Sequence, residues 1–451
     1  MSLLVVWLGL LYGWTCGFGF INDDFGWIAE ARSLISSGWR SPPSSGAFLR
    51  PIIHLSFLFN YLINGTAPFG YHLLNLGVAA LNTYLVWRLA RWILQAPVES
   101  VLVALLFAAH SAHPGAVTGD CGRTELIADA FYLGALLLHI RGRTAGAAAL
   151  FALALLSKEG TVTFPLMALV VDRLEPRTPR WRWGSVAVYG CVLAAYLALR
   201  AGLSRTYSTY VGLEVVLHGP VSESVRWMSG QVGVMAQSLL DMARVGPTAA
   251  VSVLVLLIVP LSLAARDARA RRAVRLGSVW MAVTILPFLG VPLLVPRYAY
   301  LPSVGLALVL VGGGRELLAR RPGRRWVRVA LAGCVAGWLT VSVWRTETRN
   351  EQLRRNSVLT QRVLDALARA VPQPASQTVF VVDGLGSLRL GRDPWARTPV
   401  LLFCLTDAVR LRFDDPTLDA VFPDDRLPPT AARTVVRVRW DDATGRVAIL
   451  R

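Results

Sequence analysis

The chain has 451 residues, of which 54% are apolar and 16% are charged, and its formal net charge is +18. Soluble globular proteins carry about a quarter of charged residues, so this composition excludes a chain built only of soluble domains. The basic residues fall in short gaps between apolar runs, where positive charge marks the cytoplasmic side of a membrane. We therefore attribute the charge to membrane topology and expect no nucleic-acid partner.

Apolar stretches of membrane-spanning length recur from the first residues to about residue 344. About 20 helical residues cross a hydrocarbon core about 30 Å thick, and on this basis we expect about eleven transmembrane helices. The first stretch has no basic start and no clear cleavage site, so we expect an uncleaved span rather than a signal peptide. The expected spans are residues 3–20, 71–93, 98–112, 126–140, 144–156, 161–171, 183–203, 247–265, 276–295, 298–312 and 327–343.

Topology follows from the arginines between these spans. Alternation from a cytoplasmic N-terminus places every arginine cluster on the cytoplasmic side. The short spans 144–156 and 161–171 could form one broken hairpin instead, which leaves the topology unchanged. The segment 21–70 and the residues after 345 are then exported. Arginine replaces lysine almost throughout, which suggests a GC-rich genome and a bacterial inner membrane.

The C-terminal residues differ from the rest, because they are charged and their apolar residues come in short runs at 378–382, 400–404, 434–440 and 446–450. The last two runs flank a loop that ends in Gly445, which is typical of a β-hairpin. We therefore predict an all-α polytopic membrane domain, residues 1–345, followed by a small soluble α/β or β domain, residues 346–451, on the exported side.

Two adjacent carboxylates, Asp23 and Asp24, directly follow the first span. A carboxylate close to hydrocarbon is costly and is often functional. A solvated helix end explains the pair equally well. Arg50 precedes an apolar stretch that contains His54 and predicts an interfacial helix. Its guanidinium suits a phosphate ligand, although an arginine here can also extend to lipid headgroups.

Charged residues recur at three further span boundaries. His113 precedes a proline, and Arg123 and Glu125 begin a span, where a helix cap with an ion pair is as good an explanation as a site. Arg297 lies beside Tyr298, and an aromatic belt with an extended arginine is the alternative there.

Lys158 and Glu159 interrupt an apolar run, and Lys158 is the only lysine in the chain. A charged pair between two short half-spans is expensive unless it faces a cavity. We therefore favour a functional role for this pair over a structural role at a turn.

Taken in order, these motifs resemble the GT-C superfamily of glycosyltransferases, and within it the transmembrane O-mannosyltransferases with tetratricopeptide repeats. The resemblance covers about residues 1–345, although the repeats are missing and the segment between His113 and Arg123 is shorter than in the family, which puts an acidic role for Asp120 in doubt. The motifs are Asp23-Asp24, Leu49-Arg50-Pro51, residues 71–76, His113-Pro114, residues 122–126, residues 157–160 and residues 297–303.

The resemblance implies a GT-C-like fold and transfer of a monosaccharide, such as mannose, from a polyprenyl-phosphate carrier with inversion. It also implies that Asp23 is the general base for a hydroxyl acceptor, with Asp24 as the second choice. Cations stabilise charge that develops on a leaving phosphate. The candidates for this role are Arg50, Arg123, Lys158 and Arg297, with His54, His113, Glu125, Glu159 and Tyr298 as supporting residues.

The expected partners are the bilayer, the lipid-linked sugar donor and a protein or glycan acceptor. We expect no metal, and a divalent cation held by Asp23 and Asp24 is the alternative. A transporter or lipid-linked sugar flippase is the main rival function, although no repeated half is visible. A membrane scaffold that presents the C-terminal domain is a second rival, and it requires neither the acidic pair nor Lys158.

Overall fold

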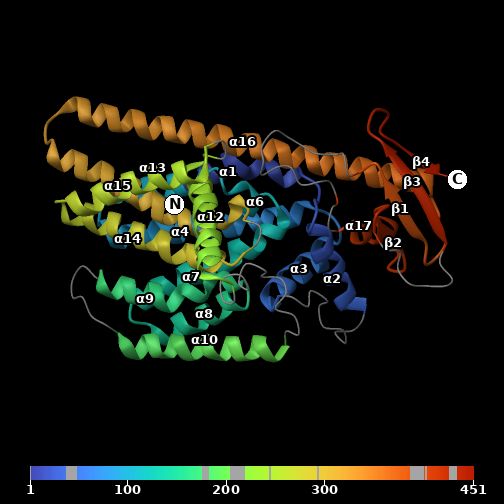
Figure 1. Cartoon of the computed structure of the whole chain (residues 1–451), viewed down its shortest axis with the longest axis horizontal. Helices are drawn as coiled ribbons and strands as arrows, with labels where there is room; N and C mark the ends of the chain where they lie inside the picture. Colours follow the sequence, from blue (N-terminus) through green and yellow to red (C-terminus); the bar gives the residue numbers. More distant parts are fainter. Residues whose placement is uncertain are drawn as a thin grey trace.

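The structure, a computed structural model, describes residues 2–36, 48–174, 182–203, 219–242, 245–291, 294–385, 401, 404–425 and 434–450. A helix bundle makes up most of the molecule, and a small sheet lies beyond one end of it (Figure 1). We call this end the sheet end and the opposite end of the bundle the far end. The apolar run predicted at residues 400–404 lies largely outside the described residues.

Helices follow the expected spans in chain order, with two further helices, α2 and α3, between the first and second spans. Those two occupy the segment that we expected to be exported. The helices up to the middle of the chain are α1 (Ser2–Tyr12), α2 (Asp24–Ser36), α3 (Pro51–Asn64), α4 (Phe69–Leu94), α5 (Pro97–Ala108), α6 (Pro114–Val117), α7 (Arg123–Ile140), α8 (Thr144–Leu155), α9 (Phe164–Arg173) and α10 (Trp183–Leu203).

The second half of the bundle adds α12 (Val221–Leu240), α13 (Pro247–Ala264), α14 (Ala268–Ile285), α15 (Pro302–Arg320) and α16 (Arg325–Ala370). Helix α12 was not predicted, because it lies between the expected spans 183–203 and 247–265. It packs against α13 and crosses the direction of α10 and α16 (Figure 1). Its sequence mixes apolar residues with Ser, Glu, Arg and Gln, so it contains no continuous apolar run.

Helix α14 begins earlier than the predicted span 276–295. Asp267 explains the difference, because its side chain accepts hydrogen bonds from the backbone N–H groups of Arg269 (3.1 Å) and Ala270 (2.8 Å) and so caps the helix. The arginines that we assigned to a gap between spans therefore lie on the first turns of α14.

Four helices among the described residues are long and apolar enough to cross a membrane: Phe69–Leu94, Trp183–Gly202, Pro302–Arg320 and Arg325–Ala370. Shorter apolar helices, such as Pro97–Ala108 and Thr144–Leu155, lie beside them in the sequence. This pattern supports a multi-pass membrane protein. The count of about eleven spans stays a prediction.

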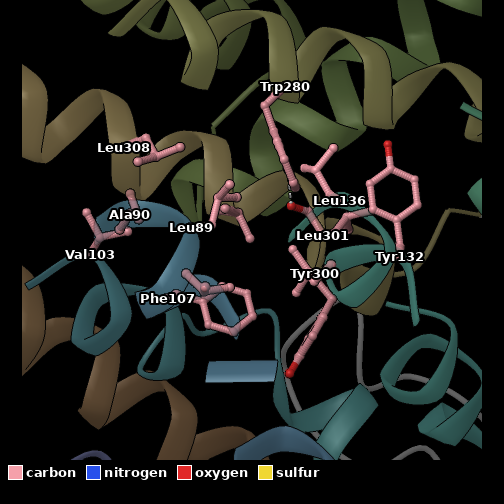
Figure 2. Close-up of a cluster of buried hydrophobic side chains, with 14 of the residues drawn as sticks. Leu89, Ala90, Val103, Phe107, Tyr132, Leu136, Trp280, Tyr300, Leu301 and Leu308 are labelled. Atoms are coloured by element: carbon pink, nitrogen blue, oxygen red, sulfur yellow. Dashed lines mark hydrogen bonds between the residues drawn. The ribbon is translucent and has the colours of Figure 1, made fainter. Parts of the chain in front are cut away.

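The centre of the bundle is a continuous apolar core to which α4, α5, α7, α14 and α15 contribute. Figure 2 shows part of it, where the buried indole of Trp280 donates a hydrogen bond of 2.8 Å to the carbonyl oxygen of Leu301. Helices α14 and α15 approach closely at Gly277 and Gly305. A Cβ atom on Gly277 would lie 2.5 Å from the carbonyl oxygen of Gly305, so only glycine permits this contact.

The sheet confirms the predicted C-terminal hairpin and makes this part of the chain α/β. Its strand order is β2 (Asp419–Val421), β1 (Val379–Asp383), β3 (Val435–Asp441) and β4 (Arg446–Leu450). Strand β1 is parallel to both neighbours, and β3 pairs antiparallel with β4. Gly445 has φ of 63° in the hairpin loop, a conformation that favours glycine. Helix α17 (Leu405–Phe413) packs beside β2.

Helix α16 connects the bundle to the sheet. Its 46 residues, at about 1.5 Å each, give a length of roughly 69 Å. The predicted domain boundary at residue 345 falls inside this continuous helix. Beyond it, Val363 and Leu367 join a second buried cluster with Phe57 of α3, Phe380 of β1 and Leu405 of α17. The C-terminal residues therefore share a core with α2 and α3 at the sheet end.

Candidate active site

Asp24 ties the start of α2 to the segment that precedes α7. Its carboxylate accepts hydrogen bonds from the backbone N–H groups of Ile21 (2.9 Å) and Cys121 (2.7 Å), and its side chain is fully buried. A Cβ atom on Gly122 would lie 2.4 Å from the carbonyl oxygen of Gly115, so glycine allows this segment to fold back on α6. Both oxygens of Asp24 therefore hold backbone in place.

Asp120, which was not predicted as a site residue, lies next to Asp24. Its Oδ1 accepts a hydrogen bond of 3.0 Å from Asn75 and lies 3.5 Å from Nδ1 of His72. Its Oδ2 is buried and has no hydrogen-bond partner among the described residues. We call Asp24 and Asp120 the carboxylate pair.

The carboxylate pair titrates above the ordinary range of aspartate. Burial, and after it the charge of Asp120, raises the pKa of Asp24 to about 8, while its two backbone hydrogen bonds oppose the rise. Burial raises the pKa of Asp120 to about 7, and the nearby Arg123 opposes that rise. The two carboxyl groups therefore favour their neutral forms well above pH 4.

Arg123, predicted to contact the donor, is fully buried at the start of α7. It donates hydrogen bonds from Nε to Oδ1 of Asn75 (2.8 Å) and from Nη2 to the carbonyl oxygen of Tyr71 (3.0 Å). Its guanidinium also lies 4.3 Å from the ring centre of Phe57. In this structure Arg123 therefore joins α3, α4 and α7.

Glu125, Lys158 and Arg297 come together although they are far apart in the sequence, and we call them the cation cluster. Nζ of Lys158 contacts Oε1 of Glu125, and Nε of Arg297 lies 3.3 Å from the same oxygen. The Lys158 side chain is 8% exposed and the Arg297 side chain 27%. Two cations thus share one buried carboxylate, and the side chain of Arg297 is the more exposed of the two cations.

Aromatic rings cover the lysine of the cation cluster. Nζ of Lys158 lies 4.5 Å from the ring centre of Tyr298 and 5.8 Å from that of Phe288. The two rings stack on each other with their centres 4.8 Å apart. Tyr298 therefore packs against a charged side chain rather than standing alone at a membrane boundary.

Arg50 and Glu159 form a second ion pair. Arg50 precedes Pro51, the first residue of α3, and binds Glu159 through two hydrogen bonds of 3.1 and 2.6 Å. The guanidinium also lies 4.1 Å from the ring centre of Phe48. Glu159 directly follows Lys158, so this ion pair is linked through the backbone to the cation cluster.

The two predicted supporting histidines lie in different surroundings. Nδ1 of His54 is 3.1 Å from Glu30 of α2, and its ring packs on Trp27. His113 is buried, and its Nε2 is 3.0 Å from the hydroxyl of Ser303. His54 thus connects α3 to α2, and His113 connects α6 to the start of α15.

Asp23 and Cys121 connect the carboxylate pair with the cation cluster. The backbone of Cys121 binds Asp24, and its Sγ lies 3.8 Å from Nη1 of Arg297. Burial raises the pKa of the Cys121 thiol well above its usual range, and the charge of Asp23 raises it further. Asp23 is half-buried and also acts electrostatically on Arg297. A partly exposed carboxylate therefore lies within electrostatic range of a cation.

Several residues of this arrangement had no predicted role. Asn75 lies in the motif of residues 71–76, but a single amide within an apolar helix gives a weak signal, and it links Asp120 to Arg123. Asp129, one turn after Glu125 on α7, is buried and lies within electrostatic range of Lys158. The spacing of Glu125 and Asp129, four residues on one helix, could have suggested a shared face.

Within the described ranges, no group of three or more His, Cys, Asp or Glu side chains is arranged to hold a metal ion. Asp23 and Asp24 supply two carboxylates, and both oxygens of Asp24 already accept backbone hydrogen bonds. A divalent cation at this pair stays an untested alternative.

No family model matches the chain. Parts of it are similar to protein O-mannosyl-transferases. Over 187 residues it is 35% identical to Tmtc1 of Drosophila melanogaster, which covers 37% of this chain and 22% of that protein. Over 138 residues it is 34% identical to human TMTC3, which covers 28% and 15%. The chain thus matches about a fifth or less of the length of these curated relatives.

Among solved structures, the chain resembles ArnT from Cupriavidus metallidurans bound to undecaprenyl phosphate. The TM-score is 0.56 at 14% identity, and the match covers 98% of this chain and 93% of the other. At this identity the likeness shows the fold alone. The chain thus has the fold of ArnT, and the resemblance to the O-mannosyltransferases inferred from its motifs is confirmed over the matched residues.

Proposed function

We propose that the protein is a membrane glycosyltransferase that moves a monosaccharide from a polyprenyl-phosphate carrier to a hydroxyl acceptor. The observation that carries this proposal is that the half-buried Asp23 lies within electrostatic range of Arg297 of the cation cluster. A base for the acceptor and a cation for the leaving phosphate are the two groups that this transfer needs. The names of the curated relatives and the ligand of ArnT agree with it.

Asp23 is the proposed general base, and the surroundings of the two adjacent aspartates support this choice. Both oxygens of Asp24 accept backbone hydrogen bonds in a fully buried position, so an acceptor hydroxyl would have to displace one of them. Asp23 is half-buried and directly precedes α2, and its carbonyl oxygen accepts a hydrogen bond from the N–H of Trp27 in the first turn of that helix. We assign Asp24 to holding the backbone around Asp23.

The proposed reaction is a single displacement with inversion. The acceptor oxygen forms a bond to the anomeric carbon while its proton passes to Asp23. The bond from that carbon to the phosphate oxygen breaks, and the electron pair stays on the lipid phosphate. The sugar carries oxocarbenium character in between. Arg297 and Lys158 stabilise the charge that develops on the phosphate.

The other predicted cations receive different parts in this proposal. Arg123 is fully buried among protein acceptors, so we assign it a structural role. Arg50 holds Glu159 through two hydrogen bonds and has a small exposed surface, 12% of its side chain. We therefore assign Arg50 to positioning the loop that carries Lys158, with contact to the donor as a further role.

The proposed location is a bacterial inner membrane, with the sheet end exported. Helices α14 and α16 begin at the far end with several arginines each, and α15 ends there. Such arginines mark the cytoplasmic side. The candidate site and the C-terminal residues then face the exported side, with the N-terminus in the cytoplasm. The acceptor is a protein or a glycan.

The proposal is tested by incubating purified protein with short-chain polyprenyl-phosphate mannose and measuring donor consumption, including slow hydrolysis to water. Wild type is compared with Asp23→Asn and Asp24→Asn, and thermal unfolding shows whether each variant is folded. We expect Asp23→Asn to lower consumption about 10²- to 10⁴-fold in a folded protein. Asp24→Asn is expected to lower both the unfolding temperature and the activity.

The possible results separate the proposal from its rivals. Equal activity of wild type and a folded Asp23→Asn variant would reject Asp23 as the base but keep the enzyme class. No consumption of this donor, or of glucose, galactose and arabinose analogues, would favour a transporter or flippase.

A further inference from the structure

The start of α17 lies against the first turn of α2, the helix that directly follows Asp23. A Cβ atom on Gly26 would lie 3.3 Å from Sγ of Cys404 and 3.6 Å from Oδ2 of Asp407. Gly26 follows Asp23 by three residues, so both lie at the start of this helix, and the charge of Asp23 acts on the Cys404 thiol. Two side chains from the C-terminal part of the chain therefore lie next to the proposed base.

This contact is held by packing and by charge. Ile28 of α2 and Leu405 and Ala408 of α17 belong to one buried cluster. At the other end of α17, Nη2 of Arg32 lies 2.7 Å from Oδ1 of Asp414 and donates to its carbonyl oxygen at 3.1 Å. Contacts at both ends of α17 therefore fix its position over α2.

The electrostatics agree with this placement of Cys404. Burial, and after it the charge of Asp23, raises the pKa of the Cys404 thiol to about 12, while a backbone hydrogen bond with Gly26 opposes the rise. The side chain is therefore a neutral thiol, which packs as a small apolar group. The Cys404 side chain therefore affects the surroundings of Asp23 through its size rather than through a charge.

We propose that Cys404 and Asp407 form one wall of the path by which an acceptor hydroxyl reaches Asp23, so that the C-terminal part of the chain limits acceptor size. This inference rests on the proposed function. Arg297 lies just before α15 and contacts Cys121 at the start of α7, so the donor side of the site is built from the bundle. Changes at the start of α17 should therefore alter the choice of acceptor and leave donor binding unchanged.

The juxtaposition itself is tested without activity. In a disulfide the two sulfur atoms are about 2 Å apart and the two Cβ atoms about 3.8 Å, and a Cβ atom at position 26 would lie 3.3 Å from Sγ of Cys404. Mild oxidation of Gly26→Cys in the full-length protein should join residues 26 and 404, detected as a linked peptide by mass spectrometry. Gly26→Cys combined with Cys404→Ser is the control and should give no such peptide. A folded Gly26→Cys variant without the link would overturn the proposal.

Acceptor choice is tested with simple alcohols, because the natural acceptor need not be known. Wild type, Cys404→Leu and Cys404→Ala are supplied with the mannose donor and a mixture of methanol and n-butanol, and both glycosides are quantified. We expect Cys404→Leu to lower the butyl-to-methyl ratio about tenfold and Cys404→Ala to raise it. Asp407→Ala should raise it as well. Hydrolysis to water and the KM for the donor should stay within about twofold of wild type, since the donor side is untouched.

The matched control is Arg412→Ala, an exposed residue of α17 that pairs with Asp365 away from α2. It should leave the alcohol ratio at the wild-type value. An unchanged ratio in all Cys404 and Asp407 variants would overturn the inference. So would an equal fall in every product, which a purely structural role predicts. A wild-type protein that consumes neither the mannose donor nor its glucose, galactose and arabinose analogues would reject the proposed function and this inference together.

Discussion

Helix α7 carries a buried cluster of charged residues at each end, and the two clusters differ in how completely their polar groups are paired. At the far end, His139 binds Asp172 and Tyr189 through its two ring nitrogens, both at 3.0 Å. Arg182 also binds Asp172, through its backbone N–H and through its guanidinium. We call these four residues the far cluster.

At the sheet end the pairing is incomplete. Oδ2 of Asp120 and Nε of Arg297 make no hydrogen bond among the described residues, although Nε lies within ion-pair distance of Glu125. Asp23 is half-buried and lies within electrostatic range of Arg297. Buried polar groups in proteins are nearly always paired, and those that are not call for an explanation such as a ligand. The comparison suggests that the far cluster stabilises the fold and that the sheet end binds substrate.

The largest expected effect is on stability, at the far cluster. Asp172→Ala leaves His139 and the backbone of Arg182 without their acceptor, and loss of one partner from a buried pair costs about 3 to 5 kcal/mol. We expect a fall of this size in the free energy of unfolding, measured by denaturant titration in detergent. Donor consumption per folded molecule should be unchanged. A loss of activity greater than about tenfold in the folded variant would contradict the division of roles.

Arg297 and Arg182 offer a matched pair for the converse test. Each pairs with a buried carboxylate, and their side chains are 27% and 29% exposed. We expect Arg297→Gln to lower kcat about 10²- to 10³-fold because a cation at the leaving phosphate is lost, with little change in unfolding temperature. Arg182→Gln should lower the unfolding temperature and spare kcat. If both variants behave alike, the two ends of α7 do not differ in function.

Local sequence signals predicted much of the bundle and several residues of the site. Lys158 and Arg297 stood out because charges at the edges of apolar spans are costly, and α4 and α10 were visible as long apolar runs. The hairpin of β3 and β4 followed from two short strands around a glycine. These features depend on neighbours in the sequence, which an inspection of the chain reveals directly.

Ion pairs and packing contacts between residues far apart in the sequence could not be predicted in the same way. Lys158 pairs with Glu125, 33 positions away, while the adjacent Glu159 binds Arg50, 109 positions away. The packing of α17 on α2 depends on the tertiary path of α16. Asp120 was doubted because the segment looked short, and only the folded chain shows it beside Asp24.

The smallest expected effect is a pH dependence at the carboxylate pair. The folded pKa values, about 8 for Asp24 and about 7 for Asp120, lie above the ordinary value of 3.8. The folded state therefore binds more protons than the unfolded state between about pH 4 and pH 8. In that range the contribution of these groups to stability falls as the pH rises. The loss is complete once the pH has passed the folded values.

Asp120→Asn tests this sign. It removes one of the two charges and should bring the pKa of Asp24 closer to 3.8, because the neighbouring carboxylate contributes to its rise. As the pH is raised from 5 to 8, the unfolding temperature of the variant minus that of wild type should therefore increase. Asp365→Asn, at an exposed side chain, is the control and should run parallel to wild type. A constant offset between Asp120→Asn and wild type across this range would show that the pair is already ionised at pH 5. The incomplete pairing at the sheet end would then reflect a charged pocket rather than a protonated one, and a cation would be the ligand to seek there.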